Sequence, residues 1–350
     1  MRRWLVAAVV LMVACTQSGQ AAVKSSPSPV QSFSPAQSTS PVPGDLPLSR
    51  VAFSCRLPIS FSTSLGGLPN QSAFIAFPAA SVTIDISGKG GSYFDRAFSR
   101  WLTVGREAVS PDGAHYAYTE LGDQGVFYVH VVDVLTGKDR ALRESGSGFN
   151  FPPSVFDYAS EGIYIVQAFE RIQAGLWLVD PTTGSMRQVS DVSGLQLSAG
   201  GAVFWTGEVN PADHNPVVTG SSAGTLADQI DRLDIRSGGK VTWLYRPGAG
   251  LVIVGLDVQG HPLIHASVGN PQAPPKTDPI DHSATELLVA RDPTSQKTIY
   301  KGALAETLSS PVADSHGVWF GSAQGIYLYS DANGLQKVSN QPGYPANRCF

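Results

Sequence analysis

The segment Val131-Val132-Asp133-Val134-Leu135-Thr136-Gly137 carries the pattern that decides the fold. β-Branched residues, which strands favour, run up to an aspartate. The aspartate and the threonine can hydrogen-bond nearby backbone groups, and glycine tolerates the positive φ of a tight turn. The segment therefore predicts a β-hairpin whose turn lies at Asp133–Gly137.

Similar segments recur about every 49 residues along the chain. Their turn-starting positions are Asp85, Asp133, Asp180, Asp234, Asp292 and Ser330. The intervals between them contain a second turn, which ends in glycine before an apolar strand, at Gly113, Gly162, Gly201, Gly260 and Gly317. Two hairpins give four strands per repeat, which is the size and content of one β-propeller blade. The repeats predict an all-β fold, a β-propeller of six four-stranded blades over residues 49–350. A seven-bladed ring and a β-sandwich are the alternatives.

One repeat also resembles a known family. Residues 108–118 read Ala-Val-Ser-Pro-Asp-Gly-Ala-His-Tyr-Ala-Tyr. This segment resembles the repeat of TolB-type, WD-like propellers, in which Ser-Pro-Asp-Gly precedes an apolar and aromatic strand. The other four turns keep the glycine and lose the Ser-Pro pair. The resemblance implies six blades and a protein that mediates contacts with other molecules. It is specific to the fold rather than to a function.

The first fifteen residues resemble the export signal of a bacterial lipoprotein. A basic start, Met1-Arg2-Arg3, precedes the apolar run Trp4–Ala14, which is too short to span a bilayer. The junction Ala14-Cys15 resembles a lipobox, which implies a signal peptide over residues 1–14 and a lipidated Cys15. An ordinary cleaved signal is the alternative. We therefore expect the protein to be exported and anchored to the outer face of the cell membrane, or held in the periplasm.

Residues 15–48 form a second compositional class, dominated by serine, proline, glutamine, threonine and alanine. Such a segment buries too little apolar surface to offset the entropy cost of ordering it. It predicts a disordered linker between the lipid and the propeller.

Two further cysteines, Cys55 and Cys349, lie at the two ends of the predicted propeller. A propeller brings its ends together to close the ring, and export places them in an oxidising compartment. We expect a disulfide between them, with two free thiols as the alternative.

Charge excludes one class of partner. The chain has 24 Lys and Arg against 28 Asp and Glu, a net charge of −4, and no basic stripe. The electrostatic footprint of a nucleic-acid-binding protein is therefore missing. We also expect a monomer without a metal or another cofactor.

Two loops exceed the corresponding loops of other blades and are expected to lie side by side on one face, at Gly207–Gln229 and Val268–Ser283. They contain two Asp-His pairs and further acidic residues, namely Asp213, His214, Asp228, Asp278, Asp281 and His282. A cation or acid–base site, a ligand-recognition rim and a pair of solvated turns are the three interpretations.

A third candidate is the segment Tyr93–Trp101, which is dense in arginine and aromatic residues. Arg96 and Arg100 can form a platform for a carboxylate or a sugar. The alternative is the outer strand of a blade, with the arginine stems packed on neighbouring residues.

These features favour a non-catalytic binding or scaffold module for a protein, a peptide or a glycan of the cell envelope. A hydrolase or lyase with an Asp/His site at the mouth of the central channel is the alternative. The two differ in whether several ionisable groups converge on one reacting atom.

The anchoring hypothesis predicts the behaviour of one variant. Cys15→Ser removes the thiol that would carry the lipid, so the protein should leave the membrane fraction or accumulate as precursor. Fractionation and mass spectrometry of the N-terminus measure both results. A variant that stays in the membrane and is cleaved at the wild-type position would show that Cys15 is not the anchor.

Overall fold

The computed structural model describes residues 45–61, 71–88, 91–122, 127–142, 153–169, 172–211, 226–269 and 280–350. The predicted signal peptide, Cys15 and most of the predicted linker lie outside these residues. Residues 40–350 form one compact unit. In the described part of the chain, no helix has both the length and the apolar character needed to cross a membrane.

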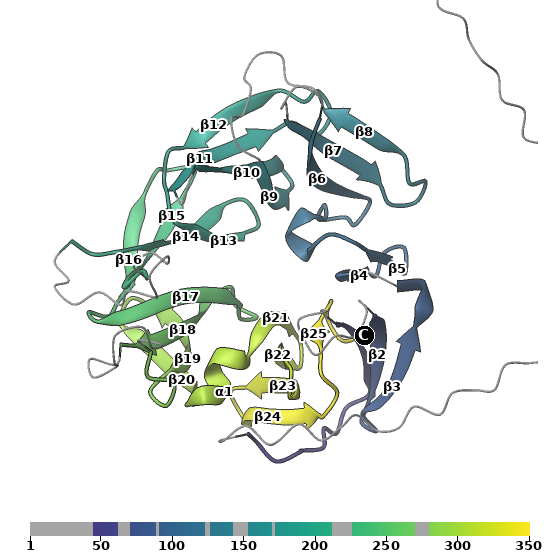
Figure 1. The fold of residues 1–350 in the computed structure, drawn as a ribbon, viewed down its shortest axis with the longest axis vertical. Coiled ribbons are helices and arrows are strands. Elements are labelled where there is room, and N and C mark those ends of the chain that lie inside the picture. Colours follow the sequence, from purple (N-terminus) through teal and green to yellow (C-terminus); the bar gives the residue numbers. More distant parts are fainter. Residues whose placement is uncertain are drawn as a thin grey trace, which may run out of the picture. The chain divides into compact units, whose positions relative to one another are not determined.

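The unit is a ring of six blades, which confirms the predicted β-propeller (Figure 1). Blade one consists of β25 (Tyr344–Pro345), β1 (Cys55–Ser60), β2 (Ser72–Phe77) and β3 (Ser81–Asp85). Blade two consists of β6 (His115–Leu121), β7 (Phe127–Asp133) and β8 (Asp139–Leu142), and Val109 pairs with Tyr116 on its inner side.

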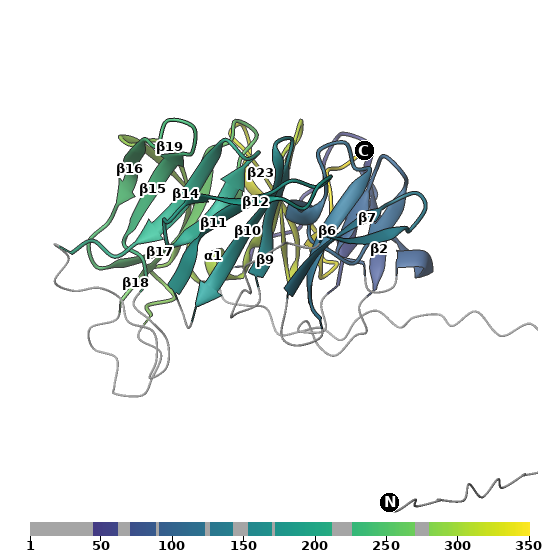
Figure 2. The ribbon, with the colours of Figure 1, turned by 90° about the horizontal axis from the view of Figure 1, so that it is seen from above.

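The other four blades each contain four consecutive antiparallel strands, and Figure 2 shows the blades from the side of the ring. From the channel outwards, blade three consists of β9 (Pro153–Ala159), β10 (Gly162–Phe169), β11 (Ile172–Val179) and β12 (Met186–Ser190), and blade four of β13 (Leu195–Ala199), β14 (Val203–Glu208), β15 (Gln229–Asp234) and β16 (Lys240–Tyr245). Blade five consists of β17 (Ala249–Leu256), β18 (Pro262–Val268), β19 (Glu286–Asp292) and β20 (Ser295–Lys301), and blade six of β21 (Ser309–Asp314), β22 (Gly317–Ser322), β23 (Gly325–Ser330) and β24 (Gly334–Ser339). The short helix α1 (Ala303–Thr307) precedes the last blade.

The turn chemistry read from the sequence is present between the third and fourth strands. The Asp133 carboxylate accepts a hydrogen bond from Thr136 N at 2.7 Å, and Asp180 accepts one from Thr182 N at 2.7 Å. Asp234 does the same with Arg236 N at 2.9 Å. Because backbone N–H groups stabilise the ionised carboxylates, the pKa values of all three aspartates lie below the usual value.

The first repeat position differs from the expectation. Asp85 forms the expected local hydrogen bond with Ser87 N, but it ends β3, the outermost strand of blade one, and the 3₁₀ turn η1 (Ile86–Gly88) follows. The third-to-fourth-strand turn of this blade lies at residues 78–80, between β2 and β3. The predicted blade count is correct, although this one position marks another turn.

Blade one closes the ring because it combines both ends of the folded unit. Ser60 of β1 pairs with Tyr344 of β25, and Arg56 and Phe350 exchange two backbone hydrogen bonds of 2.7 and 3.1 Å. The predicted disulfide joins Cys55 to Cys349, whose Cα atoms lie 5.6 Å apart. Strand pairing and a covalent bond therefore hold the same junction.

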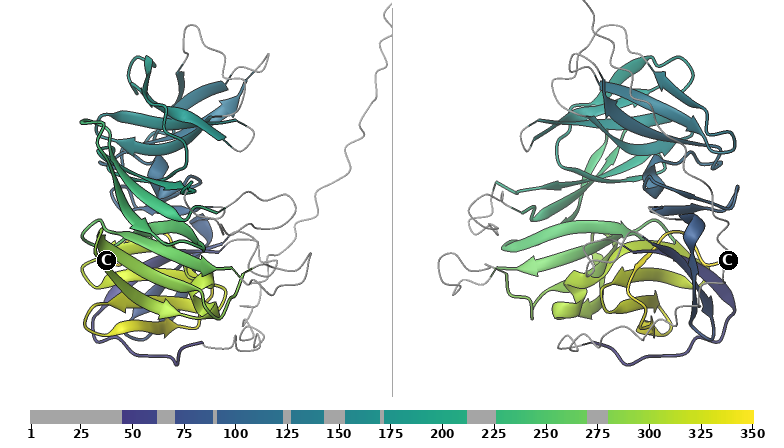
Figure 3. Two further views of the ribbon diagram at one scale, coloured as in Figure 1. Left: turned by 90° about the vertical axis from the view of Figure 1, so that its left-hand side faces the viewer. Right: turned by 45° about the vertical axis from the view of Figure 1, so that its right-hand side comes forward.

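A hydrophobic cluster joins each of the remaining pairs of neighbouring blades. Blades one and two instead have a hairpin between them. In the described residues, one cluster unites blades one and six and another unites blades two and three. The hairpin of β4 (Tyr93–Asp95) and β5 (Arg100–Leu102) lies between blades one and two (Figures 1 and 3). Its Phe94 and Trp101 pack against Phe74 of blade one, with ring centroids 5.0 and 5.7 Å away. Leu102 belongs to the cluster that reaches blade two.

The chain also contacts blade six before it enters β1. Asp45 accepts hydrogen bonds from Lys337 Nζ and from the Tyr327 hydroxyl, both at 2.7 Å. Leu48 forms a parallel bridge with Lys337. These contacts lie at residues 45–48, within the segment that composition assigned to the linker.

The closure predicts a measurable contribution from the disulfide. The double variant Cys55→Ala/Cys349→Ala should lose up to about 5 kcal/mol of unfolding free energy in the chain-entropy model. The loss should be smaller because β25 remains paired with β1, and it should appear as a melting temperature several degrees lower.

Thermal unfolding with and without a reductant measures this effect. The reductant should lower the melting temperature of the wild type towards that of the variant and leave the variant unchanged. Equal melting temperatures of the wild type and the variant without reductant would contradict the prediction.

Candidate functional site

The described bases of the two enlarged loops adjoin each other. Asp228, at the end of the blade-four loop, accepts a hydrogen bond through its carbonyl from Arg246 N at 2.9 Å. The Arg246 guanidinium donates to the carboxylate of Glu286, which follows the blade-five loop, also at 2.9 Å. Residues 212–225 and 270–279 lie outside the described residues, so Asp213, His214 and Asp278 cannot be placed.

The described candidate residues of this rim serve local structure. Asp228 is fully buried and its carboxylate accepts a hydrogen bond from Asn210 N at 2.6 Å, which ties the base of the loop together. Asp281 accepts two hydrogen bonds from Ser283 and forms a turn. His282 pairs with Glu306 of α1. Among the described residues, no three His, Cys, Asp or Glu side chains gather as metal ligands.

Arg96 and Arg100 do not form a common platform. Arg96 lies in the turn between β4 and β5, where its guanidinium stands 5.1 Å from the centre of the Phe350 ring. Arg100 donates to the carbonyls of Val134 and Leu135 at 2.7 and 3.1 Å. Arg100 thereby ties the hairpin to blade two. The segment is an inserted hairpin between two blades rather than the outer strand of a blade.

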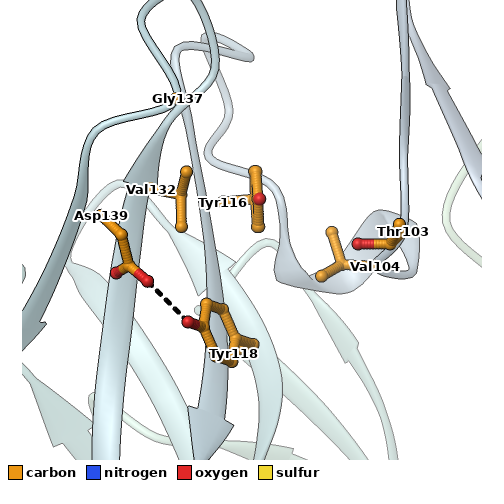
Figure 4. A pocket seen from close by; sticks show the side chains of 7 residues that line it. All are labelled: Thr103, Val104, Tyr116, Tyr118, Val132, Gly137 and Asp139. Atoms are coloured by element: carbon orange, nitrogen blue, oxygen red, sulfur yellow. Dashed lines mark hydrogen bonds between the residues drawn. The ribbon is translucent and has the colours of Figure 1, made fainter. Parts of the chain in front are cut away.

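A cavity of about 440 Å³ opens beside this hairpin, on the face of blade two that looks towards blade one. Its lining comes from β6, β7, the turn between β7 and β8, β8 and the chain that follows β5, namely Thr103, Val104, Tyr116, Tyr118, Val132, Gly137 and Asp139 (Figure 4). The cavity exists because alternate residues of β6 point to opposite faces. Ala117 is buried against blade three, whereas Tyr116 packs in the cluster that contains the hairpin residue Leu102. Tyr118 lies on the same face as Tyr116, and its hydroxyl is directed at Asp139 (Figure 4).

Hydrogen bonds fix the polar groups of the cavity. The Tyr118 hydroxyl donates to Asp139 Oδ2 at 2.6 Å, and His130 Nδ1 lies 3.0 Å from Asp139 Oδ1. The Tyr118 and His130 rings stack with centroids 4.6 Å apart, and His130 Nε2 lies 3.4 Å from Glu120. Three adjacent strands thus hold two rings and two carboxylates in one arrangement.

The same contacts set the ionisation of the site. Burial opposes ionisation of Asp139, but the hydrogen bonds from Tyr118 and His130 outweigh it and lower the pKa of the carboxyl group. The hydrogen bond to this carboxylate raises the pKa of Tyr118 to about 12. At neutral pH the site therefore presents an ionised carboxylate beside a neutral phenol.

Sequence reasoning did not identify this site. Tyr116 and Tyr118 belong to the strand of the family-like repeat, and Asp139 belongs to none of the motifs considered above. Tyr118 pairs with His130 across β6 and β7, and recognising this pair in the sequence requires knowing the register of the two strands. A tyrosine and a histidine at paired positions on one face are the feature that could have indicated it.

The chain is similar to several solved structures of other proteins. No protein-family model and no curated protein matches the chain. Similar solved structures include TolB from Acinetobacter baumannii, with 13% identity, a TM-score of 0.46 and coverage of 83% of this chain and 65% of that one. This chain thus spans less than two thirds of that TolB.

A putative TolB from Agrobacterium tumefaciens is also similar, with 10% identity and a TM-score of 0.39, covering 84% of this chain and 95% of that one. The β-propeller domain of the Trilobed protease from Pyrococcus furiosus has 10% identity and a TM-score of 0.42, and each chain is covered to 85%. The strand topology of the chain itself establishes the six-bladed β-propeller that its sequence repeat predicted. The two TolB structures are similar to it. This similarity is one of fold alone.

Proposed function

We propose that this protein is an exported, lipid-anchored binding module, and that the cavity of blade two holds a saccharide of the cell envelope. The observation that carries the proposal is the network of Tyr118, His130 and Asp139 at the wall of the cavity. The lipobox-like junction at Cys15 supports the location of the module at the envelope.

The chemistry of the cavity matches a sugar. A pyranose ring has a face of C–H groups, which packs on aromatic rings, and hydroxyl groups, which donate to carboxylates. Tyr116 and Tyr118 supply the aromatic surface, and the ionised carboxylate of Asp139 supplies the acceptor. Because Asp139 is already oriented by two partners, binding would order few side chains.

The ionisation of these groups favours binding over turnover at this site. A general acid or base works best when its pKa lies near the operating pH. The pKa of Asp139 is lowered and that of Tyr118 is raised to about 12, so each group moves away from neutrality. Both are better suited to hold hydrogen bonds than to transfer protons.

Variants of the cavity test the proposal. The Asp139→Ala and Tyr118→Ala variants should each bind envelope saccharides at least tenfold more weakly, a loss of about 1.4 kcal/mol or more. Isothermal titration with soluble peptidoglycan fragments and co-sedimentation with purified cell wall measure the effect. Tyr245→Ala is the matched control, because Tyr245 is a partly exposed tyrosine on β16 of blade four.

Wild-type binding that neither cavity variant weakens would place the ligand site elsewhere. A wild-type protein that binds none of these saccharides would contradict the ligand class. The melting temperature of each variant should be recorded alongside, so that unfolding is not mistaken for lost binding.

A further inference from the structure

The outermost strands of the six blades differ in one respect. Edge strands of soluble proteins commonly carry charged residues, lysine above all, which discourage pairing with another chain. Four of the six outermost strands follow this rule, through Arg140 in β8, Arg187 in β12, Lys240 in β16, and Lys297 and Lys301 in β20. The fifth, β24, contains Lys337, which is buried and paired with Asp45. The sixth, β3, reads Ser-Val-Thr-Ile-Asp: it contains neither a basic residue nor a proline, and its one charged residue, Asp85, is its last residue.

The apolar residues of β3 are also exposed. Val82 and Ile84 keep 39% and 43% of their surface accessible, and Ile86, just beyond the strand, keeps 89%. Val82 pairs with Ile75 and Ile84 pairs with Ala73, both fully buried in the cluster between blades one and six. The apolar face of blade one thus continues to the rim, beyond the part that blade six covers.

One side of β3 has an established partner and the other does not. Its inner side pairs with β2 along its whole length. Within the described residues, no strand pairs with its outer side. The outer side of the neighbouring strand β24 does have a partner. Leu48 forms a β-bridge with Lys337 there, and Ser49 N donates to the Lys337 carbonyl at 2.8 Å.

We propose that β3 pairs antiparallel with β3 of a second copy of this chain, so that two blade-one sheets join across a two-fold axis. The sequence of β3 is self-complementary in this arrangement. With Thr83 opposite Thr83 of the second copy, Val82 lies opposite Ile84 on the apolar face. Asp85 then lies opposite the neutral Ser81, so like charges are not brought face to face.

This pairing differs from the monomer that the sequence led us to expect. It has the closed two-fold symmetry that most homo-oligomers adopt, and it removes an exposed edge from both copies. If the proposed saccharide site is correct, a dimer also presents two such sites, which favours polymeric ligands through avidity. The dimer itself does not depend on that function.

Light scattering on the full-length protein in mild detergent tests the proposal, with the detergent contribution subtracted. The wild type should have the mass of two chains. Ile84→Lys places on β3 the kind of residue that the other outermost strands carry, so its mass should fall to that of one chain. Val241→Lys is the matched control, because Val241 is 50% exposed on β16, and its mass should match the wild type.

A cysteine variant tests the register without introducing a charge. Thr83→Cys should form a disulfide between two chains under mild oxidation, because directly opposed residues of antiparallel strands lie close together. Val241→Cys should form none. A wild type of single-chain mass at every concentration, a two-chain mass retained by Ile84→Lys, or no cross-link through Thr83→Cys would each overturn the proposal.

Discussion

The pairing of β25 with β1 is the constraint on which the rest of the structure depends. A propeller blade contacts only its neighbours, so a ring opens unless its first and last blades are joined. Here one blade takes its innermost strand from the C-terminal end of the chain and its other three from the start of the folded unit. The Cys55–Cys349 disulfide and the backbone hydrogen bonds between Arg56 and Phe350 secure this junction.

The same junction accounts for the position of the cavity. Where other neighbouring blades share a hydrophobic cluster, blades one and two are separated by the β4–β5 hairpin. Asn347, next to the disulfide, donates to the Phe94 carbonyl at 2.7 Å and so fixes this hairpin to the closing segment. Because the hairpin covers only part of the exposed face of blade two, Tyr118 and Asp139 remain open to a ligand.

Much of the fold could be predicted from the sequence because its turns are local. Asp133, Asp180 and Asp234 bond to backbone groups two or three residues away, so the pattern is visible without tertiary structure. Asp85 shows the limit, because the same local turn forms at the end of a different strand. The site could not be predicted, for two reasons. The register of β6, β7 and β8 brings the side chains of Tyr118, His130 and Asp139 together, and the β4–β5 hairpin between the blades leaves room for the cavity. Neither feature has a signature in consecutive residues.

Hydrogen–deuterium exchange of the whole protein, with and without soluble peptidoglycan fragments, tests the central claim most directly. We expect the ligand to slow exchange in β6, β7 and β8 and in the chain that follows β5, because these segments line the cavity. We expect little change at the described bases of the blade-four and blade-five loops. Protection confined to those loop bases, with blade two unchanged, would contradict the assignment of the site.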